Sequence, residues 1–471
     1  MARESEKIPT SRVRRTATVA SLAAGEAVKQ FGTRAANVTR GEAASEEAMA
    51  RRQLETAKQI VAALGTMKGA AMKLGQVMSF LDIGLVPEQH REEFQRELAK
   101  LRDAAPTVSF KQMKKVVEDD LEEPIDEVFA SFDQQPIAAA SIGQVYRATL
   151  HDGREVAVKV QYPGVAGAVR ADMQNLEMIM RLLKRMTPAL DVKAIAEEVK
   201  ERIVEELDYE LEAQNQRRIE RLRRGHPFIS VPAVNTELST RRVLVSEFIE
   251  GERFEAVRRL DQRRRDSYGE TVFRFYFGLL YRDRIALGDP HPGNYLVRPD
   301  GGVGFVDYGL LRDVTAARAD TERAIARAVR AGDAAALKSA LVAGAYLSSD
   351  GAELVDDELA LKLMRRATRW YAVPGELRFS GEQGRRGRER RPVDEERQAE
   401  VKDQLSQFTL PAETILIRRM QAIVAVVLGQ LRASADWGAI AAEYLHGEPP
   451  ATPLGEAEAE YFARHGRPSR T

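Results

Sequence analysis

Cysteine is absent from the sequence, so the chain forms no disulfide and offers no thiolate ligand to zinc. Its six histidines are scattered and form no cluster with the spacing of metal ligands. Neither sign of charge is in excess, because Lys plus Arg and Asp plus Glu both number 71. A balanced chain has no overall attraction to nucleic acid, and we expect no nucleic-acid partner.

Long apolar runs are missing as well. No run reaches the roughly 18 residues that a membrane-spanning helix requires, and the candidate at 422–428 is too short. The first residues, Met-Ala-Arg-Glu-Ser-Glu-Lys, lack the apolar core of a secretory signal. Together with the missing cysteine, these features predict a soluble protein of the reducing cytoplasm.

The sequence does contain a run of acidic, amide and turn-forming residues at 288–309. Asp289 is followed by Asn294 and then by Asp307, with a hairpin expected around 298–302. Phosphoryl transfer requires a carboxylate near the acceptor, an amide oxygen on Mg²⁺ and a second carboxylate on the metal. Singly, each residue is also a common turn former. Their joint spacing matches a kinase catalytic loop and its Asp-Phe-Gly turn, which predicts catalytic Asp289, metal ligands Asn294 and Asp307, and the cofactors ATP and Mg²⁺.

Short strands earlier in the chain supply residues that are expected to hold the nucleotide. Residues 155–161 alternate between apolar and polar, which predicts a strand that carries Lys159 like the Val-Ala-x-Lys strand of kinases. The small residues at 136–148 are expected to cover the phosphates, although such a loop is weak support by itself. A strand from 243 leads into a linker where backbone groups would contact adenine. The cofactor-binding candidates in these segments are Ala138, Ala139, Ala140, Ser141, Gly143, Lys159, Glu247 and Ile249.

Helices are predicted at 191–224, 315–373 and 401–444, with a loose tail after Gly447. The first of them carries Glu205, Glu206, Asp208 and Glu212. Each of these carboxylates fits a solvated helix face, yet a kinase requires one helix carboxylate to pair with its strand lysine. The basic run at 385–391 fits a disordered loop, or alternatively a patch for an anionic membrane or nucleic acid.

Four motifs together make the chain resemble the UbiB (AarF-domain) atypical kinases. They are Lys-Leu-Gly-Gln at 73–76, Ala-Ala-Ala-Ser-Ile-Gly-Gln-Val at 138–145, Glu-Leu-Asp-Tyr at 206–209 and Asp-Pro-His-Pro-Gly-Asn at 289–294. The resemblance spans roughly residues 55–310 in the order of the family. It implies an α+β fold, mostly helical, with the two lobes of a protein kinase and a helical N-terminal extension.

The resemblance also implies roles for individual residues. Lys73 and Gln76 should face the nucleotide and contact Glu206 and Asp208. Lys73 and Lys159 should be catalytic together with Asp289, and Lys73 should also restrain access to the site. Glu212 is the expected partner of Lys159. The implied division is a polar, partly disordered leader (1–50), the extension (51–125), a kinase-like N-lobe (126–248) and C-lobe (249–375), a basic flexible loop (376–400), and C-terminal helices with a tail (401–471).

Members of that family are ATPases or small-molecule kinases linked to isoprenoid quinone or lipid metabolism. The resemblance therefore implies ATP as a partner, a small-molecule or lipid acceptor, and peripheral contact with the inner face of a membrane. Two positions depart from the family pattern: Leu287 stands where a histidine is usual, and Tyr308 replaces the phenylalanine of the metal turn. The competing hypothesis is a nucleotide-binding pseudokinase that serves as a scaffold. An ordinary protein kinase is disfavoured by the alanine-rich segment and by the extension that carries Lys73.

Overall fold

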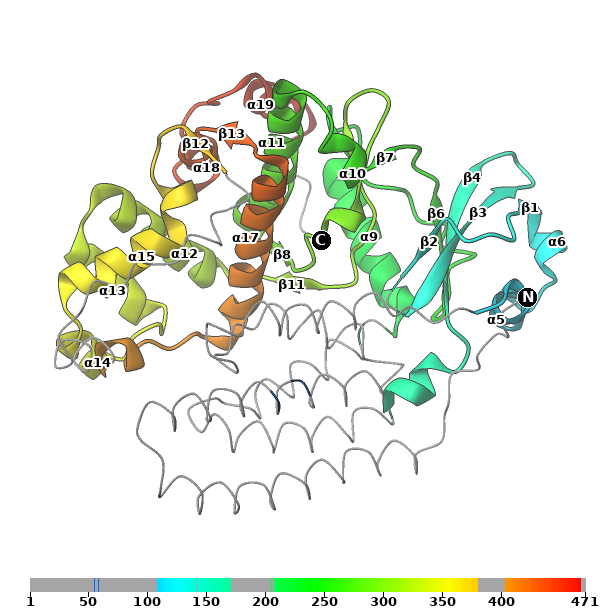
Figure 1. The fold of residues 1–471 in the computed structure, drawn as a ribbon, viewed down its shortest axis with the longest axis horizontal. Helices are drawn as coiled ribbons and strands as arrows, with labels where there is room; N and C mark the ends of the chain where they lie inside the picture. The colour runs from blue at the N-terminus through cyan, green and yellow to red at the C-terminus, as the bar shows by residue number, and fades with distance from the viewer. Residues whose placement is uncertain are drawn as a thin grey trace, which may run out of the picture. The chain divides into compact units, whose positions relative to one another are not determined.

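The computed structural model describes Glu55, Lys58 and residues 108–140, 142–170, 205, 207–379 and 403–466. The fold is α+β, and it divides into two compact units (Figure 1). Unit 1 comprises Met1–Ala213 and Val234–Phe248, and unit 2 comprises Gln214–Ala233 and Ile249–Thr471. The basic loop lies outside the described residues.

Unit 1 is built on an antiparallel sheet in the order β1-β3-β4-β6, with β2 paired to β3. In β4, Val156, Val158 and Val160 are buried. This alternation follows directly from the period of two in a strand. Helix α5 packs against β4, and residues 165–170 are helical. The elements of this unit are α5 (Phe110–Leu121), α6 (Ile125–Val128), β1 (Phe129–Phe132), β2 (Ala138–Ala139), β3 (Gly143–Leu150), β4 (Glu155–Gln161), the first residues of α9 (Tyr209–Arg223) and β6 (Val243–Glu247).

Unit 2 contains small sheets followed by helices. One sheet has the order β5-β10-β9-β7, and β8 pairs with β11. The elements before the helical region are β5 (Ile229–Ser230), β7 (Glu252–Arg253), α10 (Phe254–Val257), α11 (Gln262–Gly278), the π-helix η2 (Leu279–Asp283), β8 (Ile285–Leu287), the 3₁₀ turn η3 (Pro292–Asn294), β9 (Tyr295–Val297), β10 (Val303–Phe305) and β11 (Leu311–Asp313). Those after it are α12 (Ala316–Ala331), α13 (Ala334–Ala343), α14 (Ser349–Leu354), α15 (Asp357–Ala372), β12 (Leu377–Arg378), α17 (Ala412–Leu431), β13 (Ser434–Ala435), α18 (Trp437–Leu445) and α19 (Pro453–His465). The predicted helical content of 315–373 is confirmed.

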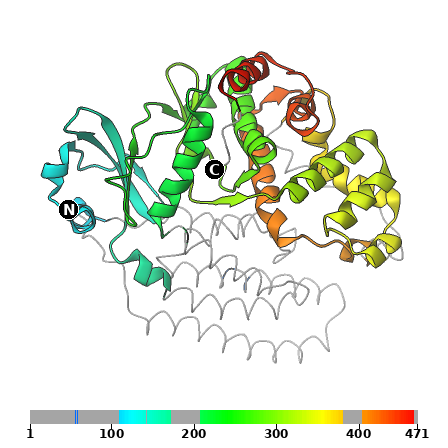
Figure 2. The ribbon, with the colours of Figure 1, turned by 180° about the vertical axis from the view of Figure 1, so that it is seen from behind.

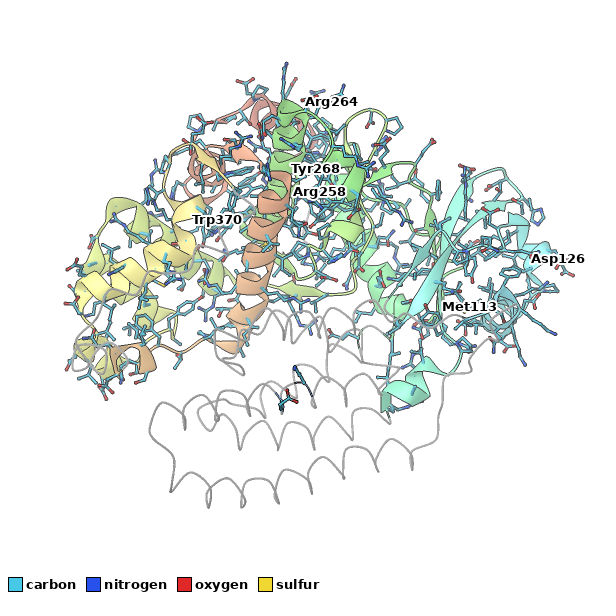
Figure 3. The ribbon with its side chains drawn as sticks, viewed as in Figure 1. Met113, Asp126, Arg258, Arg264, Tyr268 and Trp370 are labelled. Atoms are coloured by element: carbon cyan, nitrogen blue, oxygen red, sulfur yellow. The ribbon has the colours of Figure 1, made fainter. Side chains whose placement is uncertain are left out.

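Helix α11 forms the centre of unit 2, and every residue from Tyr268 to Gly278 is buried. Helix α17 runs beside it in both views of the ribbon (Figures 1 and 2). Trp370 lies on α15 (Figure 3). Its ring meets those of Phe273 and Phe277 edge-on, with centroids 5.9 and 5.7 Å away. Aromatic burial of this extent accounts for much of the hydrophobic stabilisation of the unit.

Helix α17 also changes the sequence-based view of apolar segments. Its 20 residues are long and apolar enough to cross a membrane by length and composition, so the prediction that no such segment exists was too strict. The apolar window is 61% buried inside the protein, as in the core helix of a soluble protein. The burial explains the composition, because a helix surrounded by other elements is apolar on most faces.

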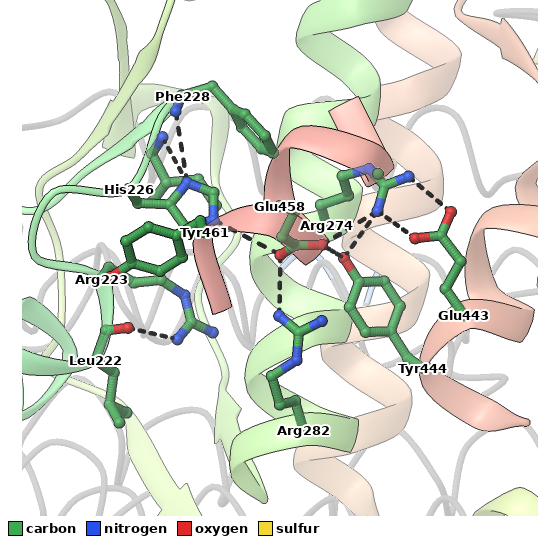
Figure 4. A network of polar contacts seen from close by, with 12 residues as sticks. Leu222, Arg223, His226, Phe228, Arg274, Arg282, Glu443, Tyr444, Glu458 and Tyr461 are labelled. Carbon is green, nitrogen blue, oxygen red and sulfur yellow. Dashed lines mark hydrogen bonds and ion pairs between the residues drawn. The ribbon is translucent and has the colours of Figure 1, made fainter. Parts of the chain in front are cut away.

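The C-terminal helix α19 is held by a buried carboxylate. The side chain of Glu458 is 2% exposed and pairs with Arg274 at 3.1 Å (Nη1–Oε2) and with Arg282 at 3.3 Å (Nη1–Oε1). The hydroxyl of Tyr444 donates a hydrogen bond to the same carboxylate, and Arg274 also pairs with Glu443 (Figure 4). A buried charge is tolerated only when such partners compensate for its lost hydration.

The expectation of a loose tail beyond Gly447 was therefore wrong. Helix α19 begins after the N-cap Thr452, whose side chain accepts from the amide of Gly455, and Pro453 occupies the first turn. The arginine that anchors Glu458 lies 184 residues earlier in the chain. Helix α19 is held in place by an ion pair between residues far apart in the sequence. The spacing of apolar residues within the helix therefore does not predict it.

We expect this network to make stability depend on pH. Burial by itself would raise the pKa of Glu458, but the interactions with His226, Arg282 and Arg274 outweigh it and lower the pKa from 4.5 to about 2. Because the folded-state pKa is the lower one, the stabilisation is present above pH 4.5 and is lost as the pH falls toward 2. It amounts to roughly 3 kcal/mol at neutral pH. Burial also lowers the pKa of His226 below 6.5. The stabilisation of the folded state by neutral His226 is therefore lost as the pH falls below 6.5.

Thermal unfolding of wild type and Glu458→Gln between pH 7 and pH 3 checks this expectation. The variant should melt lower at pH 7, and the difference should shrink below pH 4.5. Glu460→Gln is the matched control, because Glu460 lies on the same helix in an exposed pair with Arg464. A difference that stays constant down to pH 3 would contradict the assignment of Glu458 as the titrating group.

Candidate functional site

Lys159 and Glu212 form a two-pronged ion pair inside unit 1. The Nζ atom of Lys159 lies 2.7 and 2.8 Å from the two carboxylate oxygens of Glu212. Their side chains are 17% and 5% exposed, and the Lys159 ammonium also lies 5.0 Å from the ring centre of Tyr209. The pairing expected for Lys159 is thus present. Its position in β4 follows from the strand, because the buried valines occupy the alternate positions.

Asp208 begins helix α9 rather than lying inside a longer helix. Its Oδ1 accepts from the amides of Glu210 and Leu211 at 3.1 and 3.2 Å. The prediction of an unbroken helix over 191–224 was wrong, because an aspartate at an N-cap satisfies the amides that a helix start leaves open. The side chain of Gln161 donates to the carbonyls of Leu207 and Arg241 and ties this start to β4. Glu212 is therefore placed in the first turn of α9, close to Lys159.

The alanine-rich segment is partly strand rather than loop. Ala138 and Ala139 form β2 and pair with Val145 and Gln144, and the amide of Ala140 donates to the carbonyl of Gly143. The expectation of a small-residue loop is corrected for Ala138 and Ala139, because their backbone groups pair with β3 within the sheet. Their contact with phosphate remains a prediction.

Gly143 has a structural reason to be glycine. A Cβ atom at this position would lie 2.2 Å from the carbonyl oxygen of Val160 and 3.0 Å from the hydroxyl of Tyr209. The close approach of β3 to β4 therefore requires glycine here. This packing requirement accounts for the residue whether or not a nucleotide lies nearby.

In unit 2, Asp289 follows strand β8. Leu287 pairs with Leu311 of β11 and is buried, and the amide of Gly288 donates to the carbonyl of Leu310 at 2.8 Å. The position where the family has histidine is thus held by apolar packing and a strand pair. This ladder fixes the backbone immediately before Asp289.

Asn294 closes the loop onto Asp289. Its Nδ2 donates to the carbonyl of Asp289 at 3.0 Å, and its own carbonyl accepts from the amide of Val306 at 3.1 Å. The hairpin expected around 298–302 is confirmed, with β9 and β10 antiparallel and Gly301 in the left-handed region at a φ of 85°. The hairpin returns the chain to Asn294, which brings Asp307 to the same part of unit 2.

Asp307 is held by its own turn. Its Oδ1 accepts from the amide of Gly309 at 3.1 Å. Tyr308 is fully buried, its hydroxyl donates to the carbonyl of Phe305 at 2.7 Å, and its carbonyl accepts from Nδ2 of Asn215 at 3.0 Å. The tyrosine therefore replaces phenylalanine without an unsatisfied hydroxyl.

The donor atoms of Asn294 and Asp307 suit Mg²⁺. The amide nitrogen of Asn294 is committed to Asp289, which leaves its Oδ1 as the ligand atom, and Asp307 retains Oδ2. Mg²⁺ prefers oxygen ligands and is commonly bound by one or two protein groups together with phosphates and water. Among the described residues, no three His, Asp or Glu side chains gather into a metal site. A metal at this place would therefore depend on nucleotide phosphates for its remaining ligands.

The predicted adenine segment spans the boundary between the units, after Phe248. Glu247 ends β6 opposite Val156, and the amide of Phe248 donates to the carbonyl of Glu155 at 3.1 Å. That amide is already used, so it does not serve adenine. Ile249 packs against Gly304 of β10, where a Cβ atom would lie 2.9 Å from its Cγ2. The nucleotide roles of Glu247 and Ile249 remain predictions.

The candidate residues form two separate sets. Within unit 1, Lys159 contacts Glu212. Within unit 2, Asp289, Asn294 and Asp307 lie in one connected segment. Lys73, Gln76, Ser141 and Glu206 lie outside the described residues. Sequence reasoning missed Asn215, whose amide holds the Asp307 turn, and Tyr209, whose ring faces Lys159. Tyr209 is part of the Glu-Leu-Asp-Tyr motif at 206–209, so the sequence could have identified it as a candidate. No sequence motif includes Asn215.

The chain is similar in sequence to known kinase-like proteins. The model of the ABC1 atypical kinase-like domain matches residues 100–341. AarF domain-containing protein kinase 1 from Mus musculus is 34% identical over 284 residues, covering 58% of this chain and 53% of that protein. Atypical kinase COQ8B, mitochondrial, from Danio rerio is 31% identical over 333 residues, covering 70% and 53%. The chain spans about half the length of these curated relatives.

A plant protein and a solved bacterial structure are also similar to this chain. Protein ACTIVITY OF BC1 COMPLEX KINASE 7, chloroplastic, from Arabidopsis thaliana is 32% identical over 274 residues, covering 57% of this chain and 39% of that protein. Among solved structures, the complex of Rv3197 with erythromycin from Mycobacterium tuberculosis is similar with a TM-score of 0.61 and 29% identity. The similarity covers 85% of this chain and 98% of that one.

Proposed function

The chain belongs to the ABC1 family of atypical kinase-like proteins, also called the UbiB or AarF-domain family, and we propose that it is an ATP- and Mg²⁺-dependent kinase or ATPase. The observation that carries this proposal is the Lys159–Glu212 ion pair, because kinase activity requires a strand lysine held by a helix carboxylate. The intact set of Asp289, Asn294 and Asp307 supports it further.

In the proposed reaction each described residue has one task. Lys159 contacts the phosphates, and Glu212 holds its ammonium in place. Asn294 and Asp307 hold Mg²⁺, which when bound would neutralise phosphate charge. Asp289 accepts the proton of the attacking hydroxyl or water while the new P–O bond forms and the bond from the γ-phosphorus to ADP breaks. These tasks consist mostly of positioning and charge neutralisation, as phosphoryl transfer demands.

The acceptor belongs to the proposal as well. The names of the relatives COQ8B and ACTIVITY OF BC1 COMPLEX KINASE 7 support a quinone-related role. We propose that the protein acts in isoprenoid quinone or lipid metabolism and not on proteins. We place the protein in the cytoplasm, with peripheral contact at the inner face of a membrane. A second candidate ligand is a macrolide, favoured by the erythromycin complex of the similar structure.

Stabilisation by MgATP is the expected result that tests nucleotide binding. A ligand that binds only the folded state raises its stability by about 2.7 kcal/mol at a hundredfold excess over Kd. Wild type at millimolar MgATP should therefore melt several degrees higher than in buffer, and ATP with EDTA should stabilise less. An unchanged melting curve with MgATP contradicts nucleotide binding altogether.

Measurement of ATP turnover distinguishes an active kinase or ATPase from a pseudokinase scaffold. ADP release should be measured alone, with phenols that mimic quinone heads, with anionic lipid vesicles and with erythromycin. Stimulation by one of these additions identifies the acceptor class or the membrane contact. Binding of MgATP without turnover under any of these conditions favours the nucleotide-binding pseudokinase scaffold instead.

A further inference from the structure

An arginine of helix α17 lies close to the carboxylate of Asp289. The Nη2 atom of Arg419 lies 3.7 Å from Oδ1 of Asp289. The Arg419 side chain is 8% exposed and that of Asp289 is 17% exposed, so solvent screens this pair only weakly. The distance is that of an ion pair, and it is longer than a direct hydrogen bond.

A second contact joins α17 to the same loop. Leu416, one turn before Arg419, packs over Gly288, where a Cβ atom would lie 2.1 Å from its Cδ1. Residues three apart share a helix face, so Leu416 and Arg419 approach the loop together. Gly288 directly precedes Asp289, and glycine there allows the helix to lie against the backbone. The helix therefore contacts both the backbone and the carboxylate of this segment.

Helix α17 lies beyond residues 100–341, the range matched by the family domain. Its composition is explained by burial beside α11, but burial does not explain an arginine aimed at Asp289. A guanidinium retains its charge at any physiological pH and presents several donors in a fixed plane. At 3.7 Å its charge attracts the Asp289 carboxylate toward one side of the loop.

From this geometry we propose that Arg419 is a positioning residue for phosphoryl transfer, which orients Asp289 toward the acceptor from outside the matched domain. The inference rests on the proposed function, because it gives Asp289 its catalytic task. Arg419 acts through Asp289 and not on the nucleotide. Its loss should therefore slow the chemical step without weakening nucleotide binding.

The test compares kcat and KM for MgATP in full-length wild type, Arg419→Met and Arg419→Lys. Methionine removes the charge while keeping an unbranched side chain. We expect Arg419→Met to lower kcat roughly tenfold or more with KM for MgATP within about threefold of wild type. Arg419→Lys keeps the charge on a shorter, single-pronged group and should recover part of the lost kcat.

Arg418→Met is the matched control on the same helix. Arg418 pairs with the buried Glu322 at 2.6 Å and donates to the hydroxyl of Tyr346 at 2.7 Å. Its loss should lower the melting temperature while kcat stays within about threefold of wild type. A fall in kcat caused by poor folding would appear in this variant too.

The outcomes separate the two hypotheses. Wild type that turns over ATP beside Arg419→Met with an unchanged kcat overturns the role of Arg419 and leaves the proposed function standing. A raised KM with unchanged kcat overturns it as well, since Arg419 would then be a nucleotide ligand. Wild type without turnover overturns both. If Arg419→Met does not fold, the kcat of Arg419→Lys decides: a value equal to wild type shows that the guanidinium is not required.

Discussion

Replacing Lys159 with Ala is expected to slow ATP turnover at least about 100-fold, which corresponds to roughly 2.7 kcal/mol of activation free energy. Lys159 lies on β4, and its ammonium contacts both carboxylate oxygens of Glu212 on helix α9. Without its ammonium, the phosphates lose a charge partner and the substrate loses its orientation. Phosphate or ADP release at saturating MgATP measures the effect.

The structure refines what this substitution does to stability. From the sequence, loss of Lys159 should leave the fold unchanged, since it removes no core packing. The Glu212 carboxylate is only 5% exposed, however, and it loses this cation in the variant. Breaking a buried pair from one side commonly costs about 3–5 kcal/mol. We therefore expect Lys159→Ala to melt lower than wild type while remaining folded.

A second variant separates stability from chemistry. Lys159→Met combined with Glu212→Gln removes both charges, so it should regain stability relative to the single variant but no activity. Lys114→Ala serves as a control, because Lys114 is in a partly exposed pair with Glu118 on α5. Turnover by Lys159→Ala at the rate of wild type would show that β4 is not the strand of a kinase site.

Replacing Asp307 with Asn is expected to remove most of the Mg²⁺-dependent stabilisation by ATP and to slow turnover by about 100-fold or more. The amide oxygen of asparagine can still accept from Gly309, so the turn should survive. What is lost is the negative charge that a divalent cation requires near the phosphates. Melting curves at increasing Mg²⁺ with fixed ATP measure the change in metal dependence.

Asp300→Asn is a close control for this substitution. Asp300 accepts from the amide of Gly302 at 2.9 Å, two residues on, just as Asp307 accepts from Gly309. It lies in the hairpin turn and is exposed, in a pair with Arg298. Its variant should bind MgATP like wild type. An equal loss of Mg²⁺ dependence in both variants, or in neither, would contradict the assignment of Asp307 as a metal ligand.

Local patterns explain which parts of the site were predictable. The alternation at 155–161 requires a half-buried strand, and the turn residues at 298–302 require a hairpin, so β4, β9 and β10 follow from neighbouring residues alone. The helical pattern at 191–224 limited the candidate partners of Lys159 to four acidic residues, Glu205, Glu206, Asp208 and Glu212. The choice of Glu212 among them rested on the family resemblance. The structure shows that Asp208 instead caps the start of helix α9.

Long-range contacts explain the errors. Helix α19 is anchored by Glu458 and Arg274, whose sequence separation leaves no periodic signal. The alanines of β2 acquire their strand pairing from β3, and small residues alone are equally compatible with a loop. The apolar character of α17 reflects its burial beside α11, which length and composition cannot distinguish from a membrane span.

By itself, the sequence determined the family of this protein, the strand that carries Lys159, and the order and spacing of Asp289, Asn294 and Asp307. These properties reside in short segments, whose conformation depends on residues a few positions apart. The tertiary structure confirmed that Glu212 meets Lys159, and it alone showed that a close strand approach requires Gly143 and that Arg419 lies near Asp289. Such pairings depend on burial and on the packing of distant segments, because a charge is worth most where the surrounding protein excludes water.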